Sequence, residues 1–335
     1  MKSSVKERLL EILKSFEGDY VPQSYLHRVV KASKSRISEV LRELEREGLI
    51  LRTTVGRSKI IYVHPGFSEH QPSLIRKQLK LGIVYSSEYL FLGYFVKELS
   101  RHNIRVNVVV TKDGLSTTKA VAEGVLDLAF SPLVGQLYLY PVYRTYKIVQ
   151  GGLQGGFRVL HKPGKNVVYS SMISTMDYVR HYVLKKGLID AEKTVYFDDS
   201  SKIYDIVKNS GYVVAWHPIY LHLKELGFRE VITPQDLDID FCCTLAISRT
   251  VNDRYYRLIK KAYAKAIESY RKNPEKFIEY YSMVTGINVS TLKNAVEEYK
   301  VSSEINKKTY GKVINVYSLN VPSSEVYIES FNEYS

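Results

Sequence analysis

Hydroxyl side chains follow several apolar stretches of the sequence, at points where a strand is expected to give way to a helix. They are Ser86, Ser87, Tyr89, Ser116, Thr117, Ser131, Ser170, Ser171 and Ser174. Hydroxyls and free backbone N–H groups at a helix start bind carboxylate, sulfonate or phosphate groups. Trp216 and His217 follow a later stretch, and the single tryptophan favours a flat ring by stacking. Together these residues predict a binding site for an anionic or ring-containing small molecule, although a serine before a helix is often only a cap.

Catalytic and metal-binding patterns are weak by comparison. The histidines are scattered, without the H-x-x-x-H or H-E-x-x-H spacing of a metal site. Cys242 and Cys243 are adjacent, so they supply no disulfide framework, and their apolar surroundings favour a core position. Asp198 and Asp199 form an acidic pair of the kind that often starts a helix. We therefore expect no catalytic residue, no metal and no cofactor.

The candidate binding residues lie in a long stretch where strand-like and helical patterns alternate. Strands are expected at 81–85, 104–110, 127–130, 167–169, 194–197, 212–216 and 242–248, and helices at 89–100, 116–123, 174–186, 201–208, 219–226 and within 253–300. Such alternation predicts parallel sheets flanked by helices. In these sheets, ligands bind beyond the carboxyl ends of the strands. The glycine-rich run 151–156 lacks the spacing of a phosphate loop and predicts a crossover between two lobes.

The first eighty residues have a different character. They hold 16 Lys or Arg against 9 Asp or Glu, a net charge of +7 out of +13 for the whole chain. A helix with an apolar stripe is expected over 34–44, followed by strands at 48–52 and 59–63 that flank a basic glycine turn. The opposite face of the helix and the turn carry the residues that we predict to contact DNA: Lys34, Ser35, Arg36, Ser38, Arg42, Arg52, Arg57 and Lys59. A solvated basic surface without a partner is the alternative.

Both parts resemble known families. Segment 35–45, followed by Gly48, Leu49 and Ile50, resembles the winged helix-turn-helix of MarR-like and ArsR-like transcription regulators of bacteria and archaea. Segments 121–132, 170–175, 186–188 and 252–287 resemble the type II periplasmic binding proteins, in particular the sulfonate- and thiamine-pyrimidine-binding branch. Segment 211–215 departs from that family, because it lacks the usual acidic residue. A winged helix ahead of such a body resembles the LysR-type layout.

These resemblances imply an α/β chain with an N-terminal winged helix-turn-helix (α+β) and a two-lobed periplasmic-binding-protein-like domain. We expect the head at 1–64, a linker at 65–79 and the body at 80–335, with lobe 1 at 80–158 and 243–335 and lobe 2 at 159–242. The implied function is that of a DNA-binding transcription regulator, a homodimer with double-stranded DNA and a small-molecule effector as partners. A thiamine-pyrimidine-synthase-like enzyme and a body that serves only dimerisation remain alternatives.

The location of the protein is predicted from two absences in the sequence. The first residues carry charges where a signal peptide needs an apolar core, and no run of 18 apolar residues exists. The sequence therefore predicts a cytoplasmic protein without membrane contact.

Overall fold

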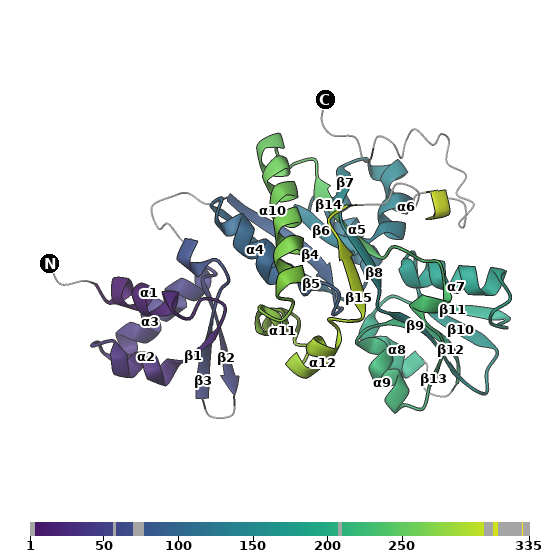
Figure 1. The fold of residues 1–335 in the computed structure, drawn as a ribbon, viewed down its shortest axis with the longest axis horizontal. Helices are drawn as coiled ribbons and strands as arrows, with labels where there is room; N and C mark the ends of the chain where they lie inside the picture. Colours follow the sequence, from purple (N-terminus) through teal and green to yellow (C-terminus); the bar gives the residue numbers. More distant parts are fainter. Residues whose placement is uncertain are drawn as a thin grey trace.

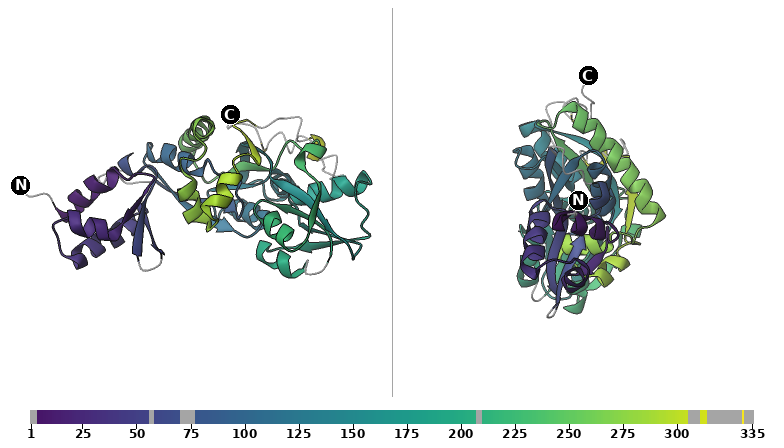
Figure 2. Two further views of the ribbon diagram at one scale, coloured as in Figure 1. Left: turned by 60° about the horizontal axis from the view of Figure 1, so that its bottom comes forward. Right: turned by 90° about the vertical axis from the view of Figure 1, so that its left-hand side faces the viewer.

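The chain forms a head and two lobes that lie in a row. The structure, a computed structural model, describes residues 4–55, 58–69, 77–206, 210–304, 311–313 and 330. The head lies at one end, the first lobe in the middle and the second lobe at the other end (Figures 1 and 2). Among the described residues, no helix combines the length and apolarity that a membrane span requires.

Three helices and a small antiparallel sheet form the head. Its elements are α1 (Val5–Lys14), β1 (Tyr20–Pro22), α2 (Gln23–Val29), α3 (Lys34–Arg46), β2 (Ile50–Val55), β3 (Ser58–Val63) and η1 (Phe67–Glu69). The strand order is β1-β3-β2. Ser33 caps α3 by accepting a hydrogen bond from the Arg36 backbone, as the pattern before this helix predicts. The apolar stripe of α3 is buried against the other two helices.

The first lobe is built on the five-stranded sheet β5-β4-β6-β14-β7. Its first elements are β4 (Lys77–Val84), α4 (Leu92–Ser100), β5 (Ile104–Thr111), α5 (Gly114–Ala122), β6 (Leu128–Pro132), α6 (Leu133–Tyr143), β7 (Tyr146–Gln150) and β8 (Gly152–Gly155). β4, β5 and β6 are parallel, and β14 (Cys243–Ser248) lies antiparallel to β6. The chain returns through α10 (Asp253–Lys272), α11 (Ile278–Thr285), α12 (Val289–Asn294) and β15 (Tyr299–Ser302). In Figure 1, α10 lies beside α4.

The second lobe repeats this arrangement with the sheet β11-β10-β12-β9-β13. Its elements are β9 (Phe157–Lys162), β10 (Val167–Ser171), α7 (Thr175–Lys185), β11 (Lys193–Phe197), η2 (Ser200–Lys202), α8 (Ile203–Ile206), β12 (Gly211–Trp216), α9 (Ile219–Glu225), β13 (Arg229–Ile232) and η3 (Pro234–Asp236). β10, β11 and β12 are parallel, and β9 is antiparallel to β12. In the spatial order of each sheet, three parallel strands are therefore followed by one antiparallel strand. This strand is β14 in lobe 1 and β9 in lobe 2, and each is the strand that the chain enters from a crossover.

Two crossovers connect the lobes. The first runs from β8 to β9 through Gly155 and Gly156, whose φ angles are +89° and +67°. A side chain at Gly156 would collide with the Tyr299 ring, which lies 2.0 Å from the position of a Cβ atom. Glycine is required here for both backbone conformation and space. The second crossover leads from η3 into β14, with Cys242 at its end and Cys243 as the first residue of the strand.

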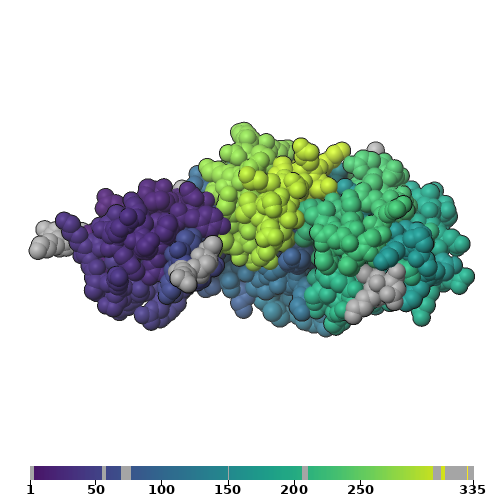
Figure 3. All heavy atoms as spheres, turned by 90° about the horizontal axis from the view of Figure 1, so that it is seen from below, coloured from purple at the N-terminus to yellow at the C-terminus, as the bar shows by residue number. Residues whose placement is uncertain are grey.

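The head packs directly against the first lobe. Glu17 in the head accepts hydrogen bonds from Lys97 Nζ of α4 at 2.6 Å and from the backbone N–H groups of Gly66 at 3.0 Å and Ser68 at 3.1 Å. The rings of Tyr62 in β3 and Tyr280 in α11 stack with centroids 5.9 Å apart. Figure 3 shows the head in contact with the middle of the molecule. The head is therefore docked on lobe 1 by an ion pair and an aromatic stack.

Several element predictions differ from the structure. β4 begins at Lys77, inside the segment that was expected to be a linker. The helix expected at 89–100 begins only at Leu92. α6 was missed, because its apolar sequence with Pro141 has no helical polar face. The all-helical run expected over 253–300 ends at α12, and the strand β15 starts at Tyr299.

Candidate ligand-binding site

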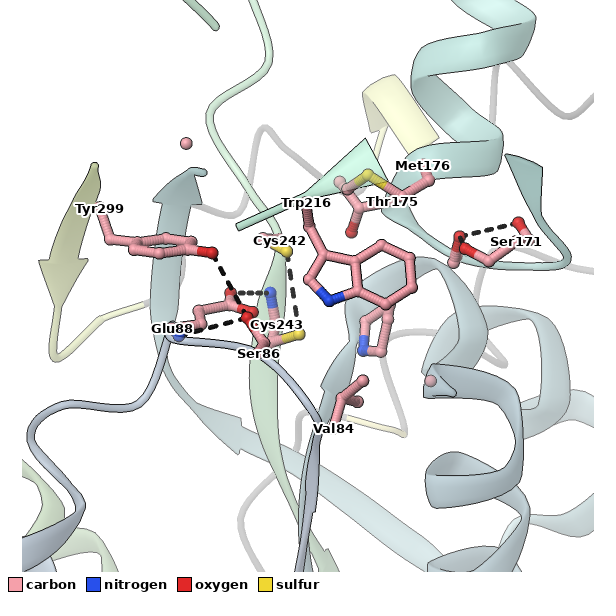
Figure 4. A pocket seen from close by; sticks show the side chains of 14 residues that line it. Val84, Ser86, Glu88, Ser171, Thr175, Met176, Trp216, Cys242, Cys243 and Tyr299 are labelled. Carbon is pink, nitrogen blue, oxygen red and sulfur yellow. Dashed lines mark hydrogen bonds between the residues drawn. The ribbon is translucent and has the colours of Figure 1, made fainter. Parts of the chain in front are cut away.

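A pocket lies between the two lobes, beyond the carboxyl ends of their parallel strands (Figure 4). It is lined by Val84, Ser86, Glu88, Gly114, Pro132, Gly155, Ser171, Ser174, Thr175, Met176, Trp216, Cys242, Cys243 and Tyr299. About 410 Å³ is free of atoms there, of which about 30 Å³ admits the centre of a water molecule. The space between the lobes is thus narrow, and a ligand larger than a few waters requires the lobes to separate or the lining to shift.

Hydroxyl groups at the start of α7 form the lobe 2 side of the pocket. Ser174 caps this helix by accepting from the Asp177 backbone at 3.2 Å, and its hydroxyl lies 2.6 Å from that of Ser171. The next hydroxyl, Thr175 Oγ1, is buried and has no hydrogen-bond partner of normal geometry. Since buried polar atoms are nearly always paired, this hydroxyl has free capacity for a bound group.

The lobe 1 side is formed by the turn after β4 and by β15. Ser86 Oγ lies 3.3 Å from the Tyr299 hydroxyl and accepts from the Glu88 backbone N–H at 3.2 Å. The hydroxyl of Tyr281 in α11 donates to the Ser86 carbonyl at 2.5 Å. The C-terminal elements therefore hold the β4 turn in place.

Trp216 joins the two lobes. It stands at the end of β12, and its indole Nε1 donates to the Tyr85 carbonyl of lobe 1 at 2.8 Å. Its ring stacks on Phe197, with centroids 6.3 Å apart. Lys112 of lobe 1 adds an ion pair of 2.7 Å to Asp199 of lobe 2. Hydrogen bonds from Lys112 and Ser201 lower the pKa of Asp199 to about 2. The hydrogen bond to Tyr85 and the ion pair of Lys112 with Asp199 thus join the two lobes, whereas the Phe197 stack lies within lobe 2.

A buried cluster of Glu88, Cys242 and Cys243 forms the floor of the pocket. Glu88 accepts from the Cys243 backbone N–H at 3.2 Å, and the two sulfurs lie 3.8 Å apart as free thiols. The Tyr89 hydroxyl donates to Cys243 Sγ at 3.1 Å. Burial raises the pKa of the Glu88 carboxyl and that of the Cys243 thiol. The sequence indicated Cys242 and Cys243 only as core residues, and Glu88 was missed.

Ser87 and His217 form a second polar pair that connects the lobes. Ser87 Oγ is hydrogen-bonded to His217 Nδ1, and the Ser87 backbone N–H donates to the His217 carbonyl at 3.2 Å. Burial lowers the pKa of His217 to about 4, so the imidazole is neutral near pH 7. Both side chains are almost fully buried and neither lines the pocket. They hold the lobes together rather than meet a ligand.

Four of the predicted ligand-binding residues line the pocket, and the others do not. Ser86, Ser171, Ser174 and Trp216 lie around it. The other predicted residues lie outside it: Ser87, Tyr89, Thr117, Ser131, Ser170 and His217 are buried, and Ser116 is exposed.

The hydrogen bonds of the buried hydroxyls show why several of the predicted residues do not line the pocket. The Thr117 hydroxyl donates to the Asp113 carbonyl of its own helix at 2.8 Å. Ser131 accepts from Thr118 at 2.9 Å inside the lobe. Strand position alone could not separate these inward hydroxyls from those that face the pocket.

Most of the side chains that were predicted to contact DNA are solvent-exposed on the head. Lys34, Ser35, Arg36, Arg42 and Lys59 are exposed, Ser38 and Arg52 are half-buried, and Arg57 lies outside the described residues. Arg36 pairs with Glu39 at 2.7 Å, and Arg52 pairs with Glu45 at 2.5 Å. Part of the basic excess is thus neutralised inside the head.

Solved structures resemble the body of the chain. A ligand-binding component of an ABC-type import system from Staphylococcus aureus, solved with zinc bound, is 13% identical with a TM-score of 0.64, over 77% of this chain and 97% of that chain. The alkanesulfonate-binding protein of Xanthomonas axonopodis pv. citri, bound to MOPS, is 13% identical with a TM-score of 0.59, over 78% and 96%. The periplasmic aliphatic sulphonate binding protein of Escherichia coli is 14% identical with a TM-score of 0.60, over 78% and 94%. No family model matches the sequence, and the curated proteins contain no significant match.

These likenesses correct the functional prediction. The neighbours are binding proteins, two of them described as a component of an import system and as periplasmic, which contradicts a DNA-binding transcription regulator with double-stranded DNA as its partner. The prediction of a cytoplasmic location is contradicted by the same neighbours. The overturned prediction rested on the helix and hairpin pattern of the head, on its resemblance to transcription regulators and on its basic excess, part of which is paired within the head. What the likenesses establish for this chain is the mixed α/β, two-lobed fold of the periplasmic binding proteins.

Proposed function

We propose that the chain is a solute-binding protein whose two lobes close on a small molecule in the pocket at Trp216. The observation that carries this proposal is the convergence of hydroxyls from both lobes and one indole ring on one narrow pocket at the strand ends. Such a protein binds and releases its ligand without chemical change, and it passes the ligand to a transporter. The neighbours, described as import components and sulfonate-binding proteins, support this role.

The lining of the pocket favours a ligand with a flat or apolar part and a group that accepts hydrogen bonds. Trp216 and Met176 supply apolar surface, while Ser171, Ser174 and Thr175 supply hydroxyls at the start of α7. Among the described residues that line the pocket there is no Lys, Arg or His. An anionic group would therefore be held by hydroxyls and helix N–H groups rather than by a cation.

Ligand binding can be tested by native mass spectrometry of freshly purified chain, followed by a thermal-shift panel that includes alkanesulfonates. Ser171→Ala should weaken binding of any ligand found, by up to about tenfold for one lost hydrogen bond. Ser116→Ala is the matched control, because Ser116 is an exposed serine at the start of α5 outside the pocket. Equal effects of the two variants, or a ligand that neither variant weakens, would place binding elsewhere.

We further propose that the head has the winged helix-turn-helix fold and that the chain divides at 1–64, 65–79 and 80–335, with lobe 1 at 80–158 and 243–335 and lobe 2 at 159–242. The element order of the head and the sheet order β1-β3-β2 support the fold. The two sheets of the body support the division into lobes. Limited proteolysis of the full chain should cut first within 65–76, ahead of β4, and initial cleavage inside α3 would contradict this division.

A further inference from the structure

The floor of the proposed binding pocket contains three potential metal ligands that come from distant parts of the sequence. The Glu88 carboxylate and the Cys242 and Cys243 sulfurs offer ligand atoms that all lie within 4.8 Å of one another, and all three residues are buried. Glu88 follows β4, whereas the two cysteines lie at the second crossover. Figure 4 shows the carboxylate and both sulfurs on the same side of the pocket. Folding alone brings them together.

The spacing of the sulfurs fits a shared metal. Their separation is 3.8 Å. Two thiolates that each lie about 2.3 Å from a tetrahedral Zn²⁺ are roughly 3.8 Å apart. The carboxylate oxygen needs only a small movement to complete three ligands, since it is already within 4.8 Å of both sulfurs. A fourth position would face the pocket.

The surroundings of the cluster contain groups that a bound cation would satisfy. Glu88 is 4% exposed, and no Lys, Arg or His among the described residues forms an ion pair with it. A buried carboxylate without a positive partner is costly unless it binds a metal or stays protonated. Thr175 Oγ1, also on the pocket, is buried beside the Cys242 thiol and has no hydrogen-bond partner of normal geometry among the described residues. The Tyr89 hydroxyl donates to Cys243 Sγ, which is how an outer group orients a metal-binding thiolate.

We propose that Glu88, Cys242 and Cys243 bind a thiophilic divalent cation such as Zn²⁺, with one coordination position open to the pocket. The inference rests on the proposed function, because the open position would be occupied by water or by the small molecule that the lobes enclose. Metal binding replaces the protons of both thiols, which are released to solvent. Two soft sulfur ligands favour Zn²⁺ over Mg²⁺ or Ca²⁺, which prefer oxygen ligands.

Cobalt(II) titration of the full chain, reduced, anaerobic and stripped with a chelator, tests the site. We expect one equivalent of Co²⁺ to bind, with a thiolate-to-cobalt charge-transfer band in the near ultraviolet and intense visible absorption from four-coordinate metal. One equivalent of Zn²⁺ should remove both signals. Cys243→Ser should abolish the charge-transfer intensity of one sulfur, and Glu88→Gln should weaken binding at least about tenfold.

Glu98→Gln is the matched control, since Glu98 is a buried carboxylate of the same lobe that pairs with Arg101 instead. It should leave Co²⁺ affinity unchanged. Melting temperatures check that each variant is folded, and Cys242→Ser replaces Cys243→Ser if the latter unfolds. Binding without a charge-transfer band, or binding that both cysteine variants retain, would overturn the cation site, as would the absence of binding.

The proposed cation site and the proposed small-molecule site can be refuted independently of each other. A small molecule that changes Trp216 fluorescence in the presence of excess chelator, together with no Co²⁺ spectrum, overturns the cation site and keeps the proposed function. A Co²⁺ spectrum that depends on Glu88 and Cys243 supports the cation site. If no small molecule then binds to either the metal-loaded or the metal-free chain, the proposed function is overturned.

Discussion

Replacement of Glu17 by glutamine should loosen the head from lobe 1. Although burial by itself would raise the pKa of Glu17, hydrogen bonds from Lys97, Ser68 and Gly66 lower it from 4.5 to about 2. A shift of this size corresponds to at most about 3 kcal/mol of stabilisation near pH 7. Because the amide oxygen of glutamine still accepts one hydrogen bond, we expect a loss of about 1–2 kcal/mol in the free energy of unfolding.

The pH dependence of this loss has a defined sign. The pKa of Glu17 is lower in the folded chain, so its contribution is complete above the unfolded value of 4.5 and disappears as the pH falls towards about 2. Glu17→Gln should therefore differ most from the parent chain at pH 7 and progressively less below pH 4.5.

Urea unfolding followed by circular dichroism measures the free-energy difference, and hydrogen exchange localises it. The amides of Gly66 and Ser68, which donate to Glu17, should exchange faster in the variant. Glu11→Gln is the matched control, because Glu11 is exposed on α1. An unchanged free energy of unfolding at pH 7, together with unchanged exchange at Gly66 and Ser68, would refute docking through Glu17.

Two further changes test the crossover and lobe closure. Gly156→Ala should lower the free energy of unfolding by about 1–3 kcal/mol more than Gly124→Ala does. Both residues have positive φ, but only Gly156 lies against the Tyr299 ring. Equal melting temperatures for the two variants would contradict the close contact. Asp199→Asn removes the ion pair with Lys112 across the lobes. Because the Lys112 side chain is largely solvent-exposed although Asp199 is buried, ligand affinity should fall by less than about tenfold. The parent chain should lose this contribution only as the pH falls from 3.8 towards about 2, and an affinity loss near pH 6 that is absent in Asp199→Asn would show the assignment to be wrong.

The two-lobed fold could be predicted from the sequence because it depends on regular patterns. Alternating strands and helices indicated the parallel sheets, and the glycine-rich run 151–156 indicated the first crossover, where Gly155 and Gly156 have positive φ. α6 was not predicted, because apolar residues lie on all sides of this helix and Pro141 lies inside it. Periodicity carries no signal for such a segment.

The site could be predicted only in part. Ser86, Ser171, Ser174 and Trp216 were found because each lies at the end of a strand or in the turn that follows it. Glu88 was not found, because no local sequence pattern links it to the two cysteines, which lie more than 150 residues later in the chain. A cluster assembled by tertiary contacts has no local spacing to detect.

The function could not be predicted from charge. The basic excess of the head indicated a polyanion, but Arg36 and Arg52 pair with acids of the head itself. Net charge is a property of composition, whereas free charge depends on which side chains meet after folding.

The most direct measurement of the central claim is the fluorescence of Trp216, the single tryptophan of the chain, during titration with a ligand recovered by native mass spectrometry. Because the indole lines the pocket and donates to Tyr85 of the opposite lobe, a bound ligand should change its emission in a saturable way. Ser171→Ala should shift the midpoint to higher concentration, and Ser116→Ala should not. A ligand that binds at one equivalent while the Trp216 emission stays constant would contradict binding between the lobes.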